Sequence, residues 1–348
     1  MEFGMFHEFP SLKGRSDAEA FDEALEQVDT AEEFGLDAMW LAELHFAPDR
    51  SLLSSPMGIA AAMAARTSRM KIGLAVQVLP LAHPLRIAEE TATVDQLSRG
   101  RLIFGVGRSG VVRTYDTYGV PYTESVERFN EALEIIRLAW TREKFAYDGK
   151  FYRFGETSVA PRPYQQPHPE IRMAASAGDT FPVIGTMGLP AFGSARHVTW
   201  GELKSQIAAY RAAWKKAGHE GDGAVFISAP TFLAASDAAA EEAAAPSIMS
   251  FYRYQAALLA DSIKRTASPT AARFARADRL AKLDFPQAMK DHVLVGTPES
   301  VARRIAQLRD ELGIDGILAE LNCGGLIPHR DVVTALRLLC TEVQPRFR

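Results

Sequence analysis

The feature that most constrains this chain is a repeated alternation between short apolar runs and segments with helical periodicity. Residues 38–42 are apolar without interruption, as is typical of a strand buried on both faces of a parallel sheet. The preceding segment is predicted to be a helix, because Ser16 and Glu19 are spaced as a capping box and Gly35 stands where a left-handed closing residue is needed. The same reasoning predicts strands at residues 2–6, 38–42, 70–79, 101–106, 171–174, 189–192, 224–233 and 316–321.

This alternation predicts a single α/β domain over residues 1–348, folded as a (β/α)8 TIM barrel. A doubly wound open sheet permits the same alternation and remains the alternative. Residues 235–295 are rich in alanine and helical in character, but their apolar stripes do not obviously face a sheet. We therefore expect an insertion there, over the C-terminal mouth of the barrel, where barrel enzymes carry their chemistry.

Composition excludes several classes of protein. A net charge of −4 gives no reason to expect nucleic acid or an anionic membrane as a partner. No stretch approaches the roughly 18 apolar residues that span a bilayer, and residues 1–10 lack the features of a signal peptide, so a cytoplasmic location is expected. The two cysteines, Cys323 and Cys340, lack zinc-site spacing, and the eight histidines are scattered, so no metal is expected.

Residues 105–110 (GVGRSG) match the G-x-G-x-x-G fingerprint of dinucleotide-binding folds. In those folds the last glycine lies inside a helix that opens on the pyrophosphate, in the first strand–helix unit. Here the motif follows the fourth predicted strand, and no helical stripe is visible before residue 126. We reject the dinucleotide interpretation. The glycines are expected instead to let the backbone approach a flat or phosphorylated ligand at the mouth.

Glu43 and His45 follow the second predicted strand, two residues apart. A carboxylate and an imidazole at a strand terminus can form an acid/base pair over a pocket. The spacing is equally compatible with a structural carboxylate and a hydrogen-bonded, half-buried histidine. Both interpretations stay open at this point.

Four further residues predict a phosphate site. Arg108 follows the fourth strand, and Arg128 lies in the first turns of the next helix. Arginine favours bidentate contact with phosphate, although either arginine alone is usually a solvated side chain. Ser176 and Thr180 flank the start of the helix after the fifth strand, and a helix N-terminus offers oriented N–H donors to an anion.

Several motifs together resemble the bacterial luciferase-like monooxygenase family. They stand in the family's order at residues 3–6 (FGMF), 35–46 (GLDAMWLAELHF), 73–84 (GLAVQVLPLAHP), 88–101, 104–108 (FGVGR) and 296–299 (GTPE). The similarity covers most of the chain and is weakest between about 235 and 290.

The resemblance implies a barrel, usually a homodimer, that binds reduced FMN at the C-terminal mouth. A separate NAD(P)H-dependent flavin reductase supplies the FMN. O2 then adds to it as a C4a-hydroperoxide, which oxidises a small organic substrate.

The resemblance also implies roles for individual residues. Ala75 and Val76 match a cis peptide beneath the isoalloxazine, and Gln77 follows them as a further expected cofactor contact. The phosphate-binding positions of the family fall on Arg108, Arg128 and Ser176, and Ser194 matches another flavin contact. Glu43 and His45 are implied to line the reacting face.

Two departures from the family pattern separate this chain from luciferase itself. Leu44 stands where close relatives of luciferase carry a first, catalytic histidine, so only His45 remains. Ala175 replaces a glutamate, so the substrate need not be an aldehyde. Two alternatives therefore stay open: hydride transfer with a 5-deazaflavin, and a non-catalytic flavin-binding partner subunit.

Overall fold

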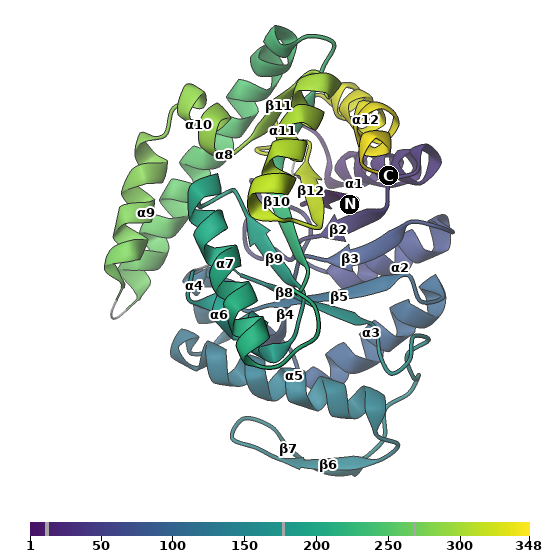
Figure 1. Ribbon diagram of the computed structural model, residues 1–348. Coiled ribbons are helices and arrows are strands. Elements are labelled where there is room, and N and C mark those ends of the chain that lie inside the picture. Colours follow the sequence, from purple (N-terminus) through teal and green to yellow (C-terminus); the bar gives the residue numbers. More distant parts are fainter. Residues whose placement is uncertain (11–13, 176–177, 267–268) are drawn as a thin grey trace.

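The computed structural model describes residues 1–10, 14–175, 178–266 and 269–348, and its centre is a closed parallel barrel (Figure 1). Its strands are β1 (Glu2–His7), β2 (Ala38–Leu41), β3 (Lys71–Leu74) continued by β4 (Gln77–Val78), β5 (Leu102–Gly107), β8 (Glu170–Ala174), β9 (Ala191–Ser194), β10 (Val225–Leu233) and β12 (Gly316–Glu320). Each pairs in parallel with its neighbours, and the ring closes because β9 pairs with β10 and β12 pairs with β1. The (β/α)8 prediction is confirmed, and the open-sheet alternative is excluded.

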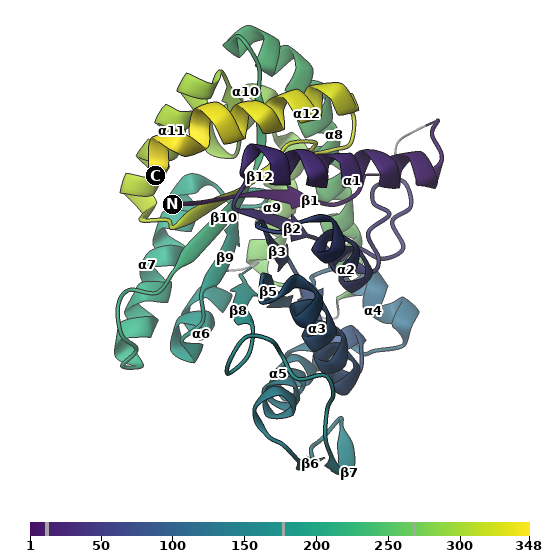
Figure 2. The ribbon, with the colours of Figure 1, turned by 90° about the vertical axis from the view of Figure 1, so that its right-hand side faces the viewer.

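Helices surround this barrel, and the first of them begins where the sequence places its cap. The surrounding helices are α1 (Asp17–Phe34), α2 (Pro56–Arg66), α3 (Pro84–Ser98), α5 (Ser125–Thr141), α6 (Thr180–Met187), α7 (Trp200–Lys216), α11 (Pro298–Leu312) and α12 (His329–Leu338). The Glu19 amide donates to Ser16 Oγ (3.3 Å), the Ser16 amide donates to Glu19 Oε2 (2.8 Å), and Gly35 has a φ of 84°. Figure 2 shows α1 and α12 side by side, so the first and last helices pack together.

The interior of the barrel, away from the C-terminal mouth, is filled by large side chains. Trp40 is fully buried and meets Phe192 edge-on, with ring centroids 4.7 Å apart. A Cβ at Gly73 would lie 2.0 Å from the Trp40 ring, so glycine is required beside it. Below them Arg172 donates to Glu2 (2.8 Å), at the N-terminal end of β1. Because this part of the interior is filled, a ligand of a barrel of this kind is expected at the C-terminal mouth.

Residues between β10 and β11 (Leu294–Gly296) form helices α8 (Asp237–Arg265), α9 (Ala271–Lys282) and α10 (Phe285–Asp291). In Figure 1 they stand to the left of the barrel, and α8 contacts α4 (Val112–Tyr118), which follows β5. The short strand β11 pairs in parallel with the end of β10. At the start of α8, Asp237 accepts hydrogen bonds from the Thr297 amide (2.7 Å) and Ser300 Oγ (3.1 Å), which begin α11.

Two local features differ from the sequence-based expectation. The region after the G-x-G-x-x-G motif forms the seven-residue helix α4, although it shows no apolar stripe. The strand expected over 70–79 is divided into β3 and β4. A hairpin of β6 (Phe145–Asp148) and β7 (Arg153–Thr157) also lies between α5 and β8. Within the described part of the chain, no helix is both long enough and apolar enough to cross a membrane.

Candidate functional site at the barrel mouth

The interruption between β3 and β4 contains a cis peptide bond between Ala75 and Val76. The cis bond that the family resemblance implies is therefore confirmed, whereas its position beneath a flavin remains a prediction. Both residues are partly exposed within the mouth. After them, β4 pairs with β5, and a Cβ on Gly107 would lie 2.5 Å from Val76 Cγ2. Because Gly107 has no side chain, the Val76 side chain can pack directly against the backbone of β5.

The carboxylate of Glu43 is fixed by three donors. Its Oε2 accepts hydrogen bonds from Gln77 Nε2 (2.7 Å) and the Val78 amide (2.8 Å), both on β4. Its Oε1 lies 2.8 Å from His45 Nε2. Because an ionised carboxylate can only accept, a neutral His45 carries its proton on Nε2. The structure therefore brings Glu43, His45 and Gln77 together, and β4 holds the pair in place.

Tyr118 completes this arrangement from the end of α4. Its hydroxyl lies 3.2 Å from His45 Nδ1, and the two rings meet edge-on with centroids 5.3 Å apart. Burial, and then the charge of Glu43, raise the pKa of Tyr118, so its hydroxyl stays protonated and can donate a hydrogen bond to His45 Nδ1. Nothing in the sequence signals this role, because Tyr118 lies 73 residues from His45.

A pocket opens beside this pair, and we call it the His45 pocket. It encloses about 330 Å³ of space, part of it open to solvent. Its lining residues come from the ends of β2, β4 and β5 and from α4 and α8: Glu43, Leu44, His45, Ala47, Val78, Leu81, Ser109, Val111, Arg113, Thr114, Tyr254 and Leu258. Helices α4 and α8 thus supply one wall of the pocket over the acid/base pair.

The two predicted phosphate-binding arginines meet at the start of α5. Arg108 Nη1 donates to Ser125 Oγ (2.9 Å), the first residue of that helix. Arg128 forms an ion pair with Glu124 (2.8 Å) and stacks over the ring of Phe151 (4.3 Å). The α5 N-terminus has no side-chain cap. A bound phosphate would thus find backbone donors there, but it would compete with Glu124 for Arg128.

The other predicted cofactor contacts are spread around the mouth. Thr180 begins α6, after the strand that neighbours β5, and its hydroxyl contacts Asp179 (3.5 Å). Ser176 lies outside the described residues. Ser194 ends β9 and accepts a hydrogen bond from Ser228 Oγ (2.9 Å).

On another side of the mouth lies a group that the sequence does not reveal: Glu8, Arg50, Arg196 and Glu320, which we call the four-charge cluster. Arg196 Nη2 donates to Glu8 Oε1 (2.5 Å) and to Glu320 Oε1 (2.8 Å). Arg50 donates to the remaining oxygen of Glu8. All four side chains are at most 11% exposed. Each follows or ends a different strand, so no spacing in the sequence connects them.

The two carboxyl groups of the cluster have opposite electrostatic environments. Burial raises the pKa of Glu320 to about 7, and the charge of Glu8 adds to the rise, against the attraction of Arg196. For Glu8, burial alone would raise the pKa, but Arg196 and Arg50 together lower it below its usual value. Glu8 is therefore ionised at neutral pH, while Glu320 titrates near it.

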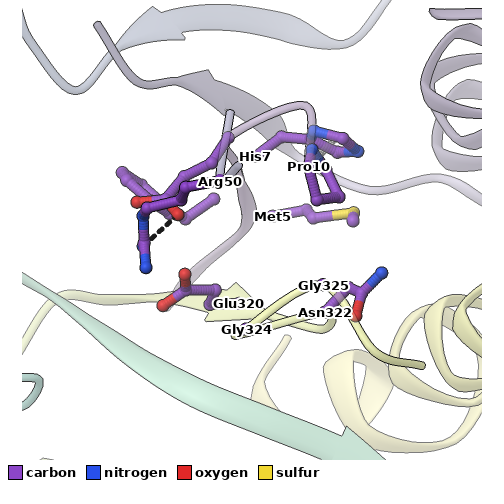
Figure 3. A pocket seen from close by; sticks show the side chains of 10 residues that line it. Met5, His7, Pro10, Arg50, Glu320, Asn322, Gly324 and Gly325 are labelled. Atoms are coloured by element: carbon purple, nitrogen blue, oxygen red, sulfur yellow. Dashed lines mark hydrogen bonds and ion pairs between the residues drawn. The ribbon is translucent and has the colours of Figure 1, made fainter. Parts of the chain in front are cut away.

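Figure 3 shows the pocket beside this cluster, which we call the Glu320 pocket. It encloses about 340 Å³, again including open space. Ten residues line it: Met5, Phe6, His7, Glu8, Pro10, Arg50, Glu320, Asn322, Gly324 and Gly325. Within the described residues, no three His, Cys, Asp or Glu side chains are grouped so that they could hold a metal ion.

A filled parallel barrel with polar pockets at the C-terminal ends of its strands is the architecture of a (β/α)8-barrel enzyme. The model of the luciferase-like monooxygenase family matches residues 1–316, and the chain belongs to that family.

Individual relatives agree with this assignment. The chain is 24% identical to the oxygenase component of the flavin-dependent trigonelline monooxygenase of Acinetobacter baylyi, covering 100% of this chain and 96% of that protein. It is 28% identical to the FMNH2-dependent dimethylsulfone monooxygenase of Pseudomonas putida, over 75% of this chain and 72% of that one. The crystal structure of the monooxygenase RslO1 from Streptomyces bottropensis superposes with a TM-score of 0.83 at 25% identity, over the whole of both chains. For several other curated relatives, including alkanal monooxygenase alpha chains, the match spans about half of their length.

Proposed function

We propose that this protein is the oxygenase component of a two-component flavin-dependent monooxygenase. It takes reduced FMN from a separate NAD(P)H-dependent flavin reductase and uses O2 to oxidise a small organic substrate. The observation that carries the proposal is the donor set at the mouth, with Arg108 and Arg128 at the start of α5 and the Glu43–His45 pair beside β4. The full-length relative that is an oxygenase component and the FMNH2-dependent relative support it.

The residues present fit FMN in the chemistry of their donors. Arg108 and the uncapped first turn of α5 would hold the phosphate, with Arg128 joining them once it releases Glu124. Ala75, Val76 and Gln77 would lie against the ring system, with Ser194 as a further contact. Thr180, at the start of α6, and Ser176 would complete the phosphate site.

When bound, reduced FMN supplies the two electrons with which one atom of O2 enters the substrate and the other leaves as water. The protein's own groups would transfer protons and exclude water from the reacting atoms. Glu43 orients His45 through Nε2, which leaves Nδ1 to accept or return a proton together with the Tyr118 hydroxyl. Helices α4 and α8 wall the His45 pocket and limit the access of water to the reacting atoms.

The test is an anaerobic titration of the protein with reduced FMN and, separately, with reduced 5-deazaflavin, followed by addition of air. Tight binding of reduced FMN, and a changed rate of its oxidation by O2 in the presence of protein, are expected. Binding of the deazaflavin with turnover in the absence of O2 would replace the proposal with hydride transfer. Binding of neither would indicate a partner subunit without flavin chemistry.

The proposal includes a homodimer, which the family resemblance implies. Sedimentation equilibrium of the purified protein measures this directly. A mass of one chain at all concentrations would contradict it without affecting the proposed chemistry, because all the site residues named above come from one chain.

A further inference from the structure

The four-charge cluster has bonding capacity that the described protein does not use. Among the described residues, Glu320 Oε2 accepts no N–H or O–H hydrogen bond, and only the weakly donating Cys323 thiol lies beside this carboxyl group, although the side chain is only 4% exposed. Arg50 Nε is also without a partner, and both residues line the Glu320 pocket. A buried polar atom without a partner destabilises the folded protein, so such atoms call for an explanation. A ligand in the pocket would supply the missing partners.

Both unused atoms at the pocket can donate. Arg50 Nε can only donate. Glu320 Oε2 becomes a donor when it carries a proton. These groups match a ligand that presents acceptors, and a carboxylate has two oxygens with about four lone-pair sites.

The net charge of the four-charge cluster also favours a carboxylate ligand. With both glutamates ionised, two positive and two negative charges cancel, and the cluster is neutral. A proton on Glu320 leaves one positive charge in excess, which a bound anion neutralises. A bound cation would instead add a further positive charge beside Arg50 and Arg196. No group of the cluster would compensate that buried charge.

The Glu320 pocket lies next to the proposed reaction site. Arg50, which lines it, stacks over the ring of Tyr254, with its guanidinium carbon 4.9 Å from the ring centroid. Tyr254 in turn lines the His45 pocket, so a single side-chain contact links the two pocket walls.

We propose that the four-charge cluster binds the carboxylate group of a small organic acid, with the Arg50 guanidinium and a protonated Glu320 as the groups that contact it. The identification of this acid as the substrate rests on the proposed function, whereas the binding site itself does not. Glu320 is then a specificity-determining residue, and a carboxylate that binds while Glu320 is ionised brings one proton onto it.

This proton uptake makes the affinity dependent on pH. Glu320 faces Glu8, Arg50, Arg196, the Cys323 thiol and Tyr252, and of these Glu8 stays ionised and the arginines stay charged near neutral pH. His7 also lines the pocket, but burial lowers its pKa to about 4, so it stays neutral. Above the pKa of Glu320, binding requires a proton that the free protein lacks. Affinity should therefore fall about tenfold between about pH 6 and about pH 8.

The experiment is isothermal titration calorimetry of the full chain, without flavin, with benzoate, benzamide and benzylamine as probes that share one ring and differ in charge. Benzoate should bind better than the other two, with uptake of a proton at the higher pH, measured by comparing buffers of different ionisation enthalpy. The Glu320→Gln variant should bind benzoate equally at both pH values, because the amide always donates. Arg50→Met should weaken binding at least about tenfold, and Glu299→Gln, an exposed glutamate on α11, is the matched control.

Three results would overturn the proposal: no benzoate binding at either pH, stronger binding of benzylamine, or a pH dependence that survives in Glu320→Gln. If Arg50→Met does not fold, the Glu320→Gln comparison decides alone. Because no flavin is present, a protein that binds benzoate but no flavin would refute only the proposed function. A protein that binds reduced FMN but no benzoate would refute only this inference.

Discussion

The Glu43–His45 pair and the four-charge cluster occupy the same mouth but are built in different ways. Glu43 and His45 are neighbours in the sequence, both carboxylate oxygens of Glu43 have partners, and His45 reaches the partly exposed Tyr118. The cluster joins the ends of distant strands, is buried, and leaves Glu320 Oε2 without an N–H or O–H partner among the described residues. Every polar atom of the Glu43 carboxylate has a partner in the first group, whereas the second has hydrogen-bonding capacity left for a ligand.

The largest effect is expected from removing the central cation of the cluster. Arg196→Met leaves Glu8 and Glu320 buried without their shared partner, and breaking a buried ion pair in this way costs about 3–5 kcal/mol of unfolding free energy. Urea denaturation at neutral pH measures it, with Arg303→Met as control, because that exposed pair contributes about 0–1 kcal/mol. Equal losses in both variants would show that the cluster is not a buried unit.

The acid/base pair should respond in rate rather than in stability. His45→Ala is expected to slow substrate oxidation about 10²-fold, at the lower end of the contribution of a positioned acid/base group. Its unfolding free energy should change much less than that of Arg196→Met. The rate is measured with saturating reduced FMN and O2, and an unchanged rate would leave His45 with no catalytic role.

The predicted phosphate site at the start of α5 provides a third region to compare with the two above. Arg108→Gln should weaken the binding of reduced FMN by about 2 kcal/mol, roughly thirtyfold, because it removes a charge-assisted contact to phosphate. Fluorescence or calorimetric titration gives the dissociation constant, and Arg86→Gln, exposed on α3, is the control. Affinity equal to that of the control variant would remove Arg108 from the phosphate site.

The smallest effect on the rate is expected from Tyr118, which contacts His45 of the proposed acid/base pair. Tyr118→Phe removes one hydrogen bond to His45 Nδ1, which is worth about 1 kcal/mol, so oxidation should slow about fivefold. The binding of reduced FMN and of benzoate should not change. A loss as large as that of His45→Ala would make Tyr118 an essential member of the proton path rather than a positioning residue.

The Glu43–His45 pair and the four-charge cluster also differ in how far they could be predicted from the sequence. Residues 38–42 and the Ser16–Glu19 capping box are decided by neighbouring residues, so β2 and α1 were predictable, and with them the barrel. Glu43 and His45 were predictable because they directly follow a recognisable strand. Helix α4 was not, because seven residues next to Gly110 are too few to show a stripe.

The cluster could not be predicted for a different reason. Arg196 and Glu320 are 124 residues apart, and their contact depends on which strands become neighbours around the closed ring. The only signal was a charged residue at the end of each strand, which many exposed positions share. The family resemblance implied the cis peptide at Ala75–Val76, but neither it nor the apolar pattern predicted the division of β3 from β4.

The insertion that carries Tyr254 leaves the barrel and returns to it at nearly one place. The end of β10 pairs with β11 directly after the insertion, and Asp237 at its start holds the first residues of α11. A segment whose two ends are already joined can change in length and composition with little cost in loop closure. Residues in α8–α10 can therefore diverge while the folding of the barrel and the proposed phosphate site stay the same, so this wall of the mouth is the part to exchange when the proposed specificity is redesigned.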